Sequence, residues 1–470
     1  MPLEPRSFWA RRAWVDGRWQ DDVRLRCDGS GHWESITPGM PMQAGDVELP
    51  GPVLPGLVDA HSHAFQRAFA GLAERREAGR AGANSSDDFW SWRDRMYGVA
   101  LRITPDALRA IAAQLYVELL RGGYTQVCEF HYLQHRPDGR RYDDPATLAW
   151  ALCDAADQSG IGLTLLPALY ERAGFDAPTL RDDQRRFAST PADIDALRRR
   201  IDASARPRVN AGIAIHSLRA ASADSIAQLL RLTGDAELPI HIHVAEQTAE
   251  VDACLEATGQ RAIEHLLSAH PLDARWQLVH ATHATPAEID AVAQSGAGIV
   301  LCPSTEANLG DGVPDLPRWL AAGVPLALGS DSQVSRHWAA ELRWLDCAQR
   351  LVLRTRNVGA APRHGQPSTA ARLFDAALAG SGRAAGQARW GLAVGARADL
   401  LVLDANADGL RGVPSSYALD ALVFATDAPA FAEVYVAGER VIAGGRHVSQ
   451  EAIGDRFEEA MASLWGDAAG

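Results

Sequence analysis

The chain has 470 residues, of which 47% are hydrophobic and 22% are charged, and its formal net charge is −13 at pH 7. This composition is typical of a folded globular protein, and an acidic chain without a basic cluster is a poor match for nucleic acid. No apolar run approaches the length of about 18 residues that a membrane span needs, and the N-terminal residues lack a signal-peptide core. We therefore expect a cytoplasmic protein without membrane contact.

The basic residues are unusual, because the sequence contains no lysine and all 46 of them are arginine. A Schiff-base lysine, a phosphate-loop lysine and a carbamylated lysine that bridges two metals are therefore excluded. The six cysteines are scattered without Cys-x-x-Cys pairs, which indicates neither a disulfide framework nor a thiolate zinc site. They are Cys27, Cys128, Cys153, Cys254, Cys302 and Cys347.

Short β-rich runs closed by polar residues recur along the chain, with alanine- and leucine-rich amphipathic stretches between them. Several of these stretches open with Thr-Pro, a helix-start signal, and close at glycine. Eight strands that alternate with helices predict an α/β protein with a (β/α)8 TIM barrel, which we place at residues 56–385. The predicted strands cover residues 53–63, 125–132, 162–170, 212–219, 238–246, 276–283, 296–305 and 324–332.

The two ends of the chain lie outside this pattern. Residues 1–55 contain short runs separated by turns, and residues 386–470 contain further strand-like segments with glycine turns. We expect the two ends to pair into one small composite β-sandwich domain beside the barrel. Residues 74–88 are charged and polar, which is typical of a loop, here over the barrel mouth.

Histidines and acids gather where the predicted strands end, and this is the face on which barrels carry chemistry. Side chains at i and i+2 of a strand share one face, so His61 and His63 aim two imidazoles at one point. His243 or His241 from the fifth strand, His280 from the sixth and Asp331 from the eighth join them. This donor set suits one divalent ion, with zinc as the leading candidate.

Glu246 follows His243 by three residues, close enough to act near the metal without binding it. Zinc activates water, and a neighbouring carboxylate can take up and return the proton. We interpret His241 as a residue of a lower barrel layer. Cys302 and Glu306 are interpreted as structural and loop-ordering residues rather than catalytic ones.

These motifs carry a family resemblance. His-Ser-His on the first strand, His-x-x-Glu on the fifth, the histidine of the sixth and Ser-Asp-Ser on the eighth resemble the single-metal deaminase branch of the amidohydrolase superfamily. The longer strings resemble its formimidoylglutamate deiminase family along almost the whole chain. They are HSHAFQRAFAGLAE, FWSWRDRMY, EFHY, HSLRA, HIHVAEQ, LVHATH and STEANLGDG. Gln333 departs from the histidine that the resemblance leads us to expect.

The resemblance implies zinc-dependent hydrolytic deimination of N-formimino-L-glutamate to N-formyl-L-glutamate and ammonia in histidine degradation. It implies one Zn²⁺ per chain, a homodimer, and three sets of site residues. The metal ligands would be His61, His63, His243 and Asp331, and the catalytic residues Glu246, His280 and Asp331. Substrate contacts would come from Gln66, Arg93, Tyr132, His216 and Arg219.

The chemistry of the substrate agrees with two of these assignments. A molecule with two carboxylates needs local cations to bind an acidic protein, and arginine forks match carboxylates well. Three alternatives stay open at this point. Another mononuclear-zinc aminohydrolase, acting on a heterocyclic ring, would favour flat, apolar contacts over arginines. A catalytically silent scaffold would have lost a site residue. An acyl-amide hydrolase would use the same metal site.

Overall fold

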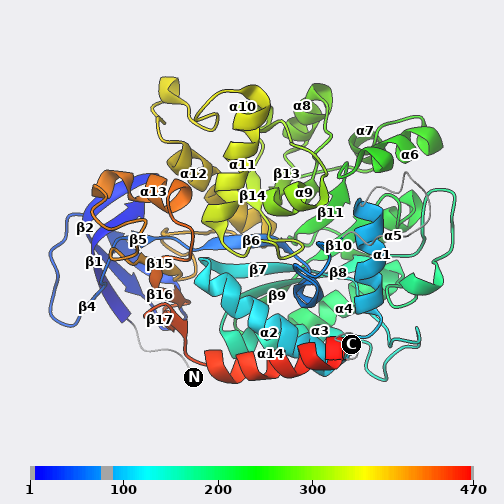
Figure 1. Ribbon diagram of the computed structural model, residues 1–470, viewed down its shortest axis with the longest axis horizontal. Coiled ribbons are helices and arrows are strands. Elements are labelled where there is room, and N and C mark those ends of the chain that lie inside the picture. The colour runs from blue at the N-terminus through cyan, green and yellow to red at the C-terminus, as the bar shows by residue number, and fades with distance from the viewer. Residues whose placement is uncertain (1–5, 76–87, 467–470) are drawn as a thin grey trace.

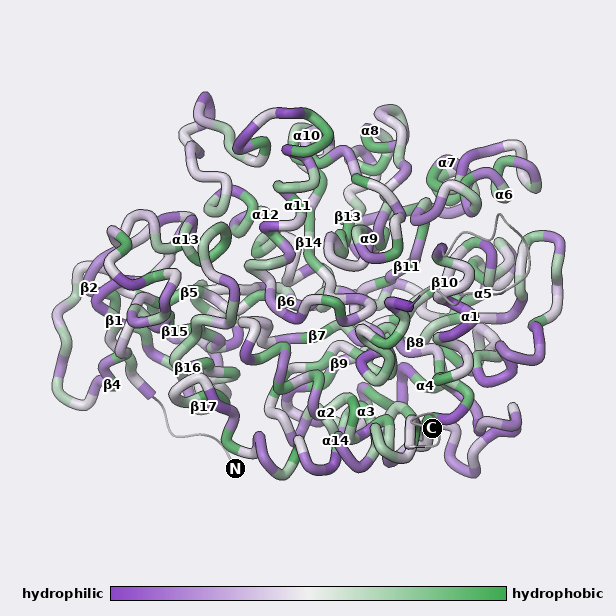
Figure 2. The backbone as a smooth tube through the Cα atoms, in the orientation of Figure 1, coloured by the Kyte–Doolittle hydropathy of each residue, from purple (hydrophilic) through white to green (hydrophobic). Residues whose placement is uncertain are grey.

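The protein is described by a computed structural model that covers residues 6–75 and 88–466 (Figure 1). Within these two ranges, no helix combines the length and the apolar character that crossing a membrane requires. Most of the predicted loop at 74–88 lies outside the described residues. Figure 2 shows hydrophobic stretches through the middle of the molecule, β14 (Leu326–Leu328) among them, and hydrophilic ones in the outer loops.

The centre of the molecule is a closed barrel of eight parallel strands, which confirms the predicted fold. Each strand pairs with the next, β8 pairs with β10, and Leu328 of β14 pairs with Asp59 of β6 to close the ring. The short strand β9 (Val209–Ala211) extends β8 outside the ring. The barrel strands are β6 (Leu57–Ser62), β7 (Tyr124–His131), β8 (Gly162–Leu169), β10 (Ile213–Ser217), β11 (Ile240–Val244), β12 (Trp276–His280), β13 (Gly298–Leu301) and β14.

Helices surround the barrel, and the Thr-Pro signals mark the start of three of them. Thr104, Thr190 and Thr285 each accept a backbone hydrogen bond in the first turn. The helices before the last barrel strand are α1 (Phe89–Ala100), α2 (Pro105–Arg121), α3 (Thr147–Ser159), α4 (Pro191–Ala203), α5 (Ala223–Thr233), α6 (Thr248–Thr258), α7 (Ala262–Ala269), α8 (Pro286–Ser295), α9 (Pro303–Leu309) and α10 (Leu316–Ala322). After it come α11 (Trp338–Leu353) and α12 (Thr369–Ala384).

The chain ends form a separate sheet with its own hydrophobic core. Strand β5 joins the two ends, because it pairs with β1 on one side and β15 on the other. Phe8 of β1 contacts Tyr435 of β16 at 5.2 Å between ring centroids, so the sheet curls over this core. Its strands are β1 (Arg6–Val15), β2 (Arg18–Cys27), β3 (Trp33–Thr37), β4 (Val47–Glu48), β5 (Val53–Leu54), β15 (Leu400–Leu403), β16 (Phe431–Val436), β17 (Glu439–Ala443) and β18 (Arg446–His447).

Two helices near the C-terminus pack on the barrel helices rather than on this sheet. Helix α13 (Ala418–Phe424) packs against α11 and α12, and α14 (Gln450–Trp465) crosses the molecule to lie along α2 (Figure 1). Trp465 donates a hydrogen bond to the carbonyl of Ala68 at 3.0 Å, in the segment that follows the first barrel strand. The C-terminal helix therefore ties the end of the chain to the barrel.

One buried histidine makes the stability of the folded state depend on pH. His337 caps α11, where its Nδ1 accepts hydrogen bonds from the backbone N–H groups of Ala339 and Ala340. Burial, with the positive charge of Arg343, lowers the pKa of His337 to about 4. An imidazole that accepts through Nδ1 must be neutral there, so protonation removes the cap.

We therefore predict that the folded state loses stability as the pH falls from about 6.5 toward 4. In this window the unfolded chain binds a proton at residue 337 that the folded chain does not, which contributes up to roughly 1.4 kcal/mol per pH unit. The variant His337→Asn keeps a capping side chain without titrating. Urea unfolding across this range should show a shallower pH slope for it, and an identical slope would contradict the assignment.

Candidate active site

Three histidines converge at the carboxyl end of the barrel. His61 belongs to β6, His63 directly follows that strand, and His243 comes from β11. The ring centroids of His61 lie 4.7 Å from those of both His63 and His243. The Nε2 atoms of His61 and His243 are 3.0 Å apart. The structure thus brings together three of the predicted metal ligands.

Two of these rings are oriented by the backbone. The Nδ1 of His63 donates to the carbonyl of Phe130 at 3.0 Å, and that of His243 donates to the carbonyl of His216 at 2.8 Å. A ring that donates through Nδ1 presents the lone pair of Nε2, which is the arrangement that metal-binding histidines use. Burial lowers the pKa of His63 and His243, and that of His61 to about 3, so all three are neutral.

Asp331 completes the group, just after the end of β14. Its Oδ1 lies 3.4 Å from Nε2 of His61 and 3.5 Å from Nε2 of His63. Burial opposes its charge, but the surrounding His61, His280 and His63 hold the pKa of Asp331 well below its usual range. Three neutral imidazoles and one ionised carboxylate fit a divalent zinc ion.

The backbone at this face is held in uncommon conformations. Of the eleven non-glycine residues with positive φ in the described ranges, five lie at the barrel mouth. They are Ala245, His280, Ala281, Asp331 and Gln333. Such conformations cost free energy and cluster at functional sites. Here they turn the chain sharply where each strand ends, so the side chains stay over the barrel axis.

A layer of buried acids and amides supports the predicted metal ligands. The sequence did not predict the supporting role of these residues. Glu129 of β7 accepts from the hydroxyl of Ser62 at 3.0 Å and from the N–H of Ala64 at 2.6 Å, so it grips the segment on both sides of His63. Gln333 donates to the carbonyl of Asp331 at 2.8 Å and to Ser62 at 3.1 Å. Gln333 therefore joins the last strand to the first, although a histidine was expected there.

Glu246 and His280 face one another beside the metal ligands. Oε1 of Glu246 lies 3.7 Å from Nε2 of His280, and Oδ2 of Asp331 lies 3.8 Å from the same nitrogen. Burial raises the pKa of Glu246 to about 7. Burial would lower that of His280, but Glu246, Glu306 and Asp331 outweigh it and raise the pKa to about 10. A carboxylate and an imidazole with shifted pKa values are suited to proton transfer.

His241 lies apart from this group although it shares the strand of His243. Its Nε2 donates to the carbonyl of Ala384 at 2.9 Å, deeper in the barrel. Glu306, in contrast, reaches the group, because its Oε1 lies 3.4 Å from Nδ1 of His280. The interpretation of Glu306 as a purely loop-ordering residue is therefore incomplete. Cys302 is fully buried, and its N–H donates to Glu306 at 2.9 Å.

All five predicted substrate residues line the cavity above the cluster, together with Glu246, His280 and Asp331. Within this set, Nε2 of Gln66 lies 3.4 Å from the hydroxyl of Tyr132. Arg93 and Arg219 each keep a buried Nε without a hydrogen-bond partner among the described residues. The five residues are Gln66, Arg93, Tyr132, His216 and Arg219.

Trp90 connects the two arginines, a role that the sequence did not suggest. The guanidinium carbon of Arg93 lies 4.5 Å from the centroid of its ring, and that of Arg219 lies 5.4 Å from it. Both distances are within the range of cation–π attraction. One aromatic ring thus contacts both cations of the cavity.

The comparisons with known proteins agree with this geometry. The model of the amidohydrolase family matches residues 53–441, which is most of the chain. The chain belongs to the amidohydrolase family. A formimidoylglutamate deiminase of Pseudomonas aeruginosa is 44% identical over 97% of this chain and 99% of its own length.

Two further relatives are less similar in sequence. The crystal structure of an amidohydrolase from Brucella melitensis superposes with a TM-score of 0.90 at 39% identity, covering 98% of this chain and 99% of the other. A 5-methylthioadenosine/S-adenosylhomocysteine deaminase of Natronomonas pharaonis is 28% identical over 83% of this chain and 81% of its own. The cluster thus lies in the barrel of an amidohydrolase. Over most of its length, the chain is similar to a deiminase and, more distantly, to a deaminase.

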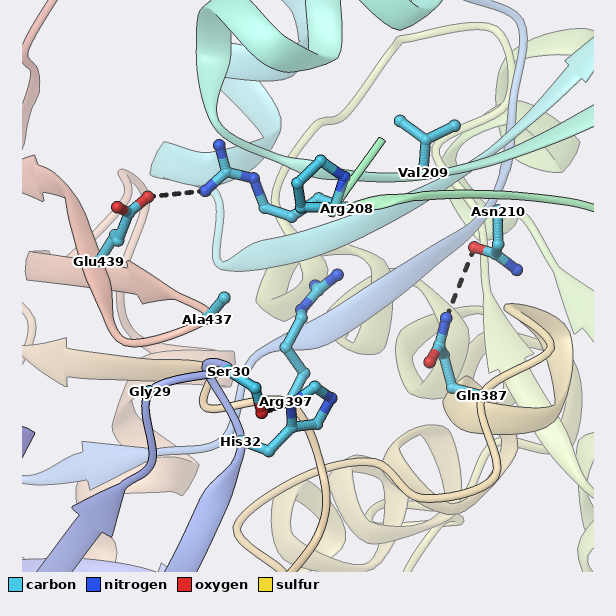
Figure 3. A pocket seen from close by; sticks show the side chains of 11 residues that line it. Gly29, Ser30, His32, Arg208, Val209, Asn210, Gln387, Arg397, Ala437 and Glu439 are labelled. Atoms are coloured by element: carbon cyan, nitrogen blue, oxygen red, sulfur yellow. Dashed lines mark hydrogen bonds and ion pairs between the residues drawn. The ribbon is translucent and has the colours of Figure 1, made fainter. Parts of the chain in front are cut away.

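A second cavity, of about 550 Å³, lies at the opposite, amino-terminal end of this amidohydrolase barrel, against the chain-end sheet. Figure 3 shows Arg208 paired with Glu439 across it, at 2.8 Å, and Gln387 bonded to Asn210 at 3.5 Å. Arg397 is paired with Asp399 at 2.6 Å. Because its charges are satisfied and barrels place chemistry at the other face, this cavity is structural.

The donor set predicts close to one divalent ion per chain, because the sequence has no lysine to bridge a second ion. His243→Gln should lose most of the bound metal in elemental analysis, since one of the three imidazoles is gone. His241→Gln is the matched control, one layer lower on the same strand, and should keep it. Two tightly bound ions per chain, or equal metal loss in both variants, would contradict the assignment.

Proposed function

We propose that the protein hydrolyses N-formimino-L-glutamate to N-formyl-L-glutamate and ammonia, a step of histidine degradation. The observation that carries this proposal is the position of Arg93 and Arg219 at the cavity that contains Glu246 and His280. Their Nε atoms have no hydrogen-bond partner in the part of the chain that the structure describes. A dicarboxylate with a reactive formimino head fits two cations at a distance from a proton-transfer pair. The identity of 44% to a formimidoylglutamate deiminase supports the same substrate.

His61, His63, His243 and Asp331 would hold one zinc ion in this proposal. The ion would supply Lewis-acid activation of the attacking water. Glu246 takes one proton of that water as its oxygen adds to the formimino carbon and passes this proton to the terminal nitrogen. The second proton moves from the new hydroxyl to the same nitrogen through Glu246 as the C–N bond breaks, so that ammonia leaves and the formyl group remains. His280 presents Nε2 from the other side and donates a hydrogen bond to the oxygen that adds to the carbon, and Asp331 helps to orient the water.

The remaining cavity residues bind the part of the substrate that does not react. Each arginine takes one carboxylate through its planar fork, which fixes both the charge and the length of the ligand. Tyr132, His216 and Gln66 supply neutral hydrogen bonds to the substrate between these two ends. This arrangement holds the formimino carbon near Glu246 and lowers the entropic cost of reaching the transition state.

A ring deaminase is the second candidate, because the chain is 28% identical to a 5-methylthioadenosine/S-adenosylhomocysteine deaminase. A purine has no carboxylate, however, and would give no acceptor to the Nε atoms of Arg93 and Arg219, which have no hydrogen-bond partner among the described residues, although Arg93 also lies 3.6 Å from Asp94. An unpaired buried charge is costly. The proposal therefore favours the linear dicarboxylate over the ring.

We also propose a cytoplasmic homodimer whose chain divides into two domains. Residues 1–55 and 386–470 would form one domain and residues 56–385 the other. The separate core of the chain-end sheet supports this division, whereas α13 and α14 of the C-terminal segment pack on the barrel helices. Leu351, Val352 and Leu353 at the end of α11 are 79%, 61% and 49% exposed, which supports a subunit contact there.

Glu246→Gln should lower kcat by about 10²–10⁴-fold, because the amide cannot accept the proton of water. The side chain keeps its size, so metal content and unfolding temperature should stay near those of the parent. Steady-state kinetics with elemental analysis checks this. A variant with full turnover would remove Glu246 from the proton-transfer role.

Arg219→Ala and Arg93→Met should each reduce kcat/KM by roughly 10²–10³-fold, since breaking a desolvated charge pair costs about 2–5 kcal/mol. N-formimino-glycine lacks the distal carboxylate, so the parent should use it poorly, and one of the two variants should lose little on it. This comparison identifies the arginine that binds the distal carboxylate. Equal use of both substrates, or parental kcat/KM in both variants, would exclude the dicarboxylate pocket.

A further inference from the structure

A buried glutamate outside the predicted catalytic set contacts His280. Glu306 lies in the first turn of α9, and its side chain turns back toward the barrel, where it is 2% exposed. One oxygen, Oε1, accepts the N–H of Cys302 at 2.9 Å and lies 3.4 Å from Nδ1 of His280. His280 itself is 1% exposed, so water does not compete for this contact.

The imidazole of His280 lies between carboxylates. Its Nδ1 faces Glu306, while its Nε2 lies 3.7 Å from Glu246 and 3.8 Å from Asp331. His280 is the last residue of β12 and has a φ of +69°, so the chain leaves the sheet at this point. A ring on such a turn has no regular strand beyond it to fix its direction and needs a partner.

We propose that Glu306 is a positioning residue for His280. Its carboxylate accepts the Nδ1 hydrogen and thereby holds Nε2 toward Glu246 and the reacting atoms. A hydrogen bond at one ring nitrogen decides what the other nitrogen can do, which is how carboxylates orient catalytic and metal-bound histidines. The inference rests on the proposed catalytic role of His280.

A second buried glutamate also attaches α9 to the rest of the fold. Glu341 of α11 is 0% exposed and accepts the N–H of Ser304 at 2.9 Å and its hydroxyl at 2.6 Å. It anchors the same first turn of α9, and no contact with His280 is found for it among the described residues. Glu341 is therefore the matched control for a purely structural role.

The experiment compares Glu306→Gln, Glu306→Met and Glu341→Gln with the parent enzyme. Met keeps the length of the side chain without an acceptor, and we expect kcat to fall about 10–100-fold with KM changed less than threefold, a loss of the size seen for other orienting partners. Gln keeps an acceptor oxygen and should restore most of kcat. Glu341→Gln should leave kcat unchanged, and all three should keep the parental metal content.

Two readouts separate positioning from structural damage. In a His280→Ala background, Glu306→Met should cost no further activity, because a residue that acts through His280 has nothing left to act on. Crystal structures should show the His280 ring displaced in Glu306→Met and retained in Glu306→Gln. If Glu306→Met does not fold, Glu306→Ala, which also lacks the acceptor, and the Glu306→Ala/His280→Ala pair carry the same comparison.

Parental kcat in Glu306→Met, or an undiminished loss in the His280→Ala background, would overturn the positioning role. A retained ring in Glu306→Met would do the same. A different result tests the proposed function instead. If His280→Ala alone keeps parental turnover, then His280 is not catalytic and the positioning role falls with it, whereas a loss in His280→Ala without one in Glu306→Met overturns this inference alone.

Discussion

The rest of the site is arranged around the close approach of two imidazole rings. Nε2 of His61 and Nε2 of His243 lie 3.0 Å apart. The two histidines come from strands on different sides of the barrel. Burial lowers the pKa of each imidazole, so both are neutral. His243 donates through Nδ1, so its Nε2 presents a lone pair to His61, and this lone pair can take either a proton on Nε2 of His61 or a cation between the two rings. Asp331, itself ionised, lies 3.4 Å from Nε2 of His61, and its negative charge favours the cation.

The layer below the ligands shows how the fold maintains this arrangement. Asp59 accepts from the N–H of Ser330 at 2.8 Å and from its hydroxyl at 2.6 Å, which ties the first strand to the turn that carries Asp331. Glu129 ties the second strand to the segment around His63. Burial raises the pKa of Asp59 to about 7 and that of Glu129 to about 8. Buried acids are costly unless they are hydrogen-bonded, and here each bond fixes a ligand-bearing segment.

The sequence predicted what depends on local pattern. Alternating strands and helices predicted the barrel, and the spacing of His61 and His63 predicted a shared direction. It did not predict what depends on how distant segments meet. Trp90 stacks on two arginines far apart in the chain, and Glu306 reaches His280 from the neighbouring strand's helix. The sequence pattern placed residues 386–470, which include helix α14, in the chain-end domain. In the structure, α14 packs on the barrel, because its apolar face contacts α2.

In the proposed reaction, the oxygen of water replaces the imino nitrogen of a linear dicarboxylate. The most direct test incubates the purified protein with N-formimino-L-glutamate and follows all products by NMR together with an ammonia assay. We expect one N-formyl-L-glutamate and one ammonia for each substrate molecule consumed, with no free glutamate or formate. Release of formate or glutamate, or no turnover of this substrate alongside deamination of 5′-methylthioadenosine, would contradict it.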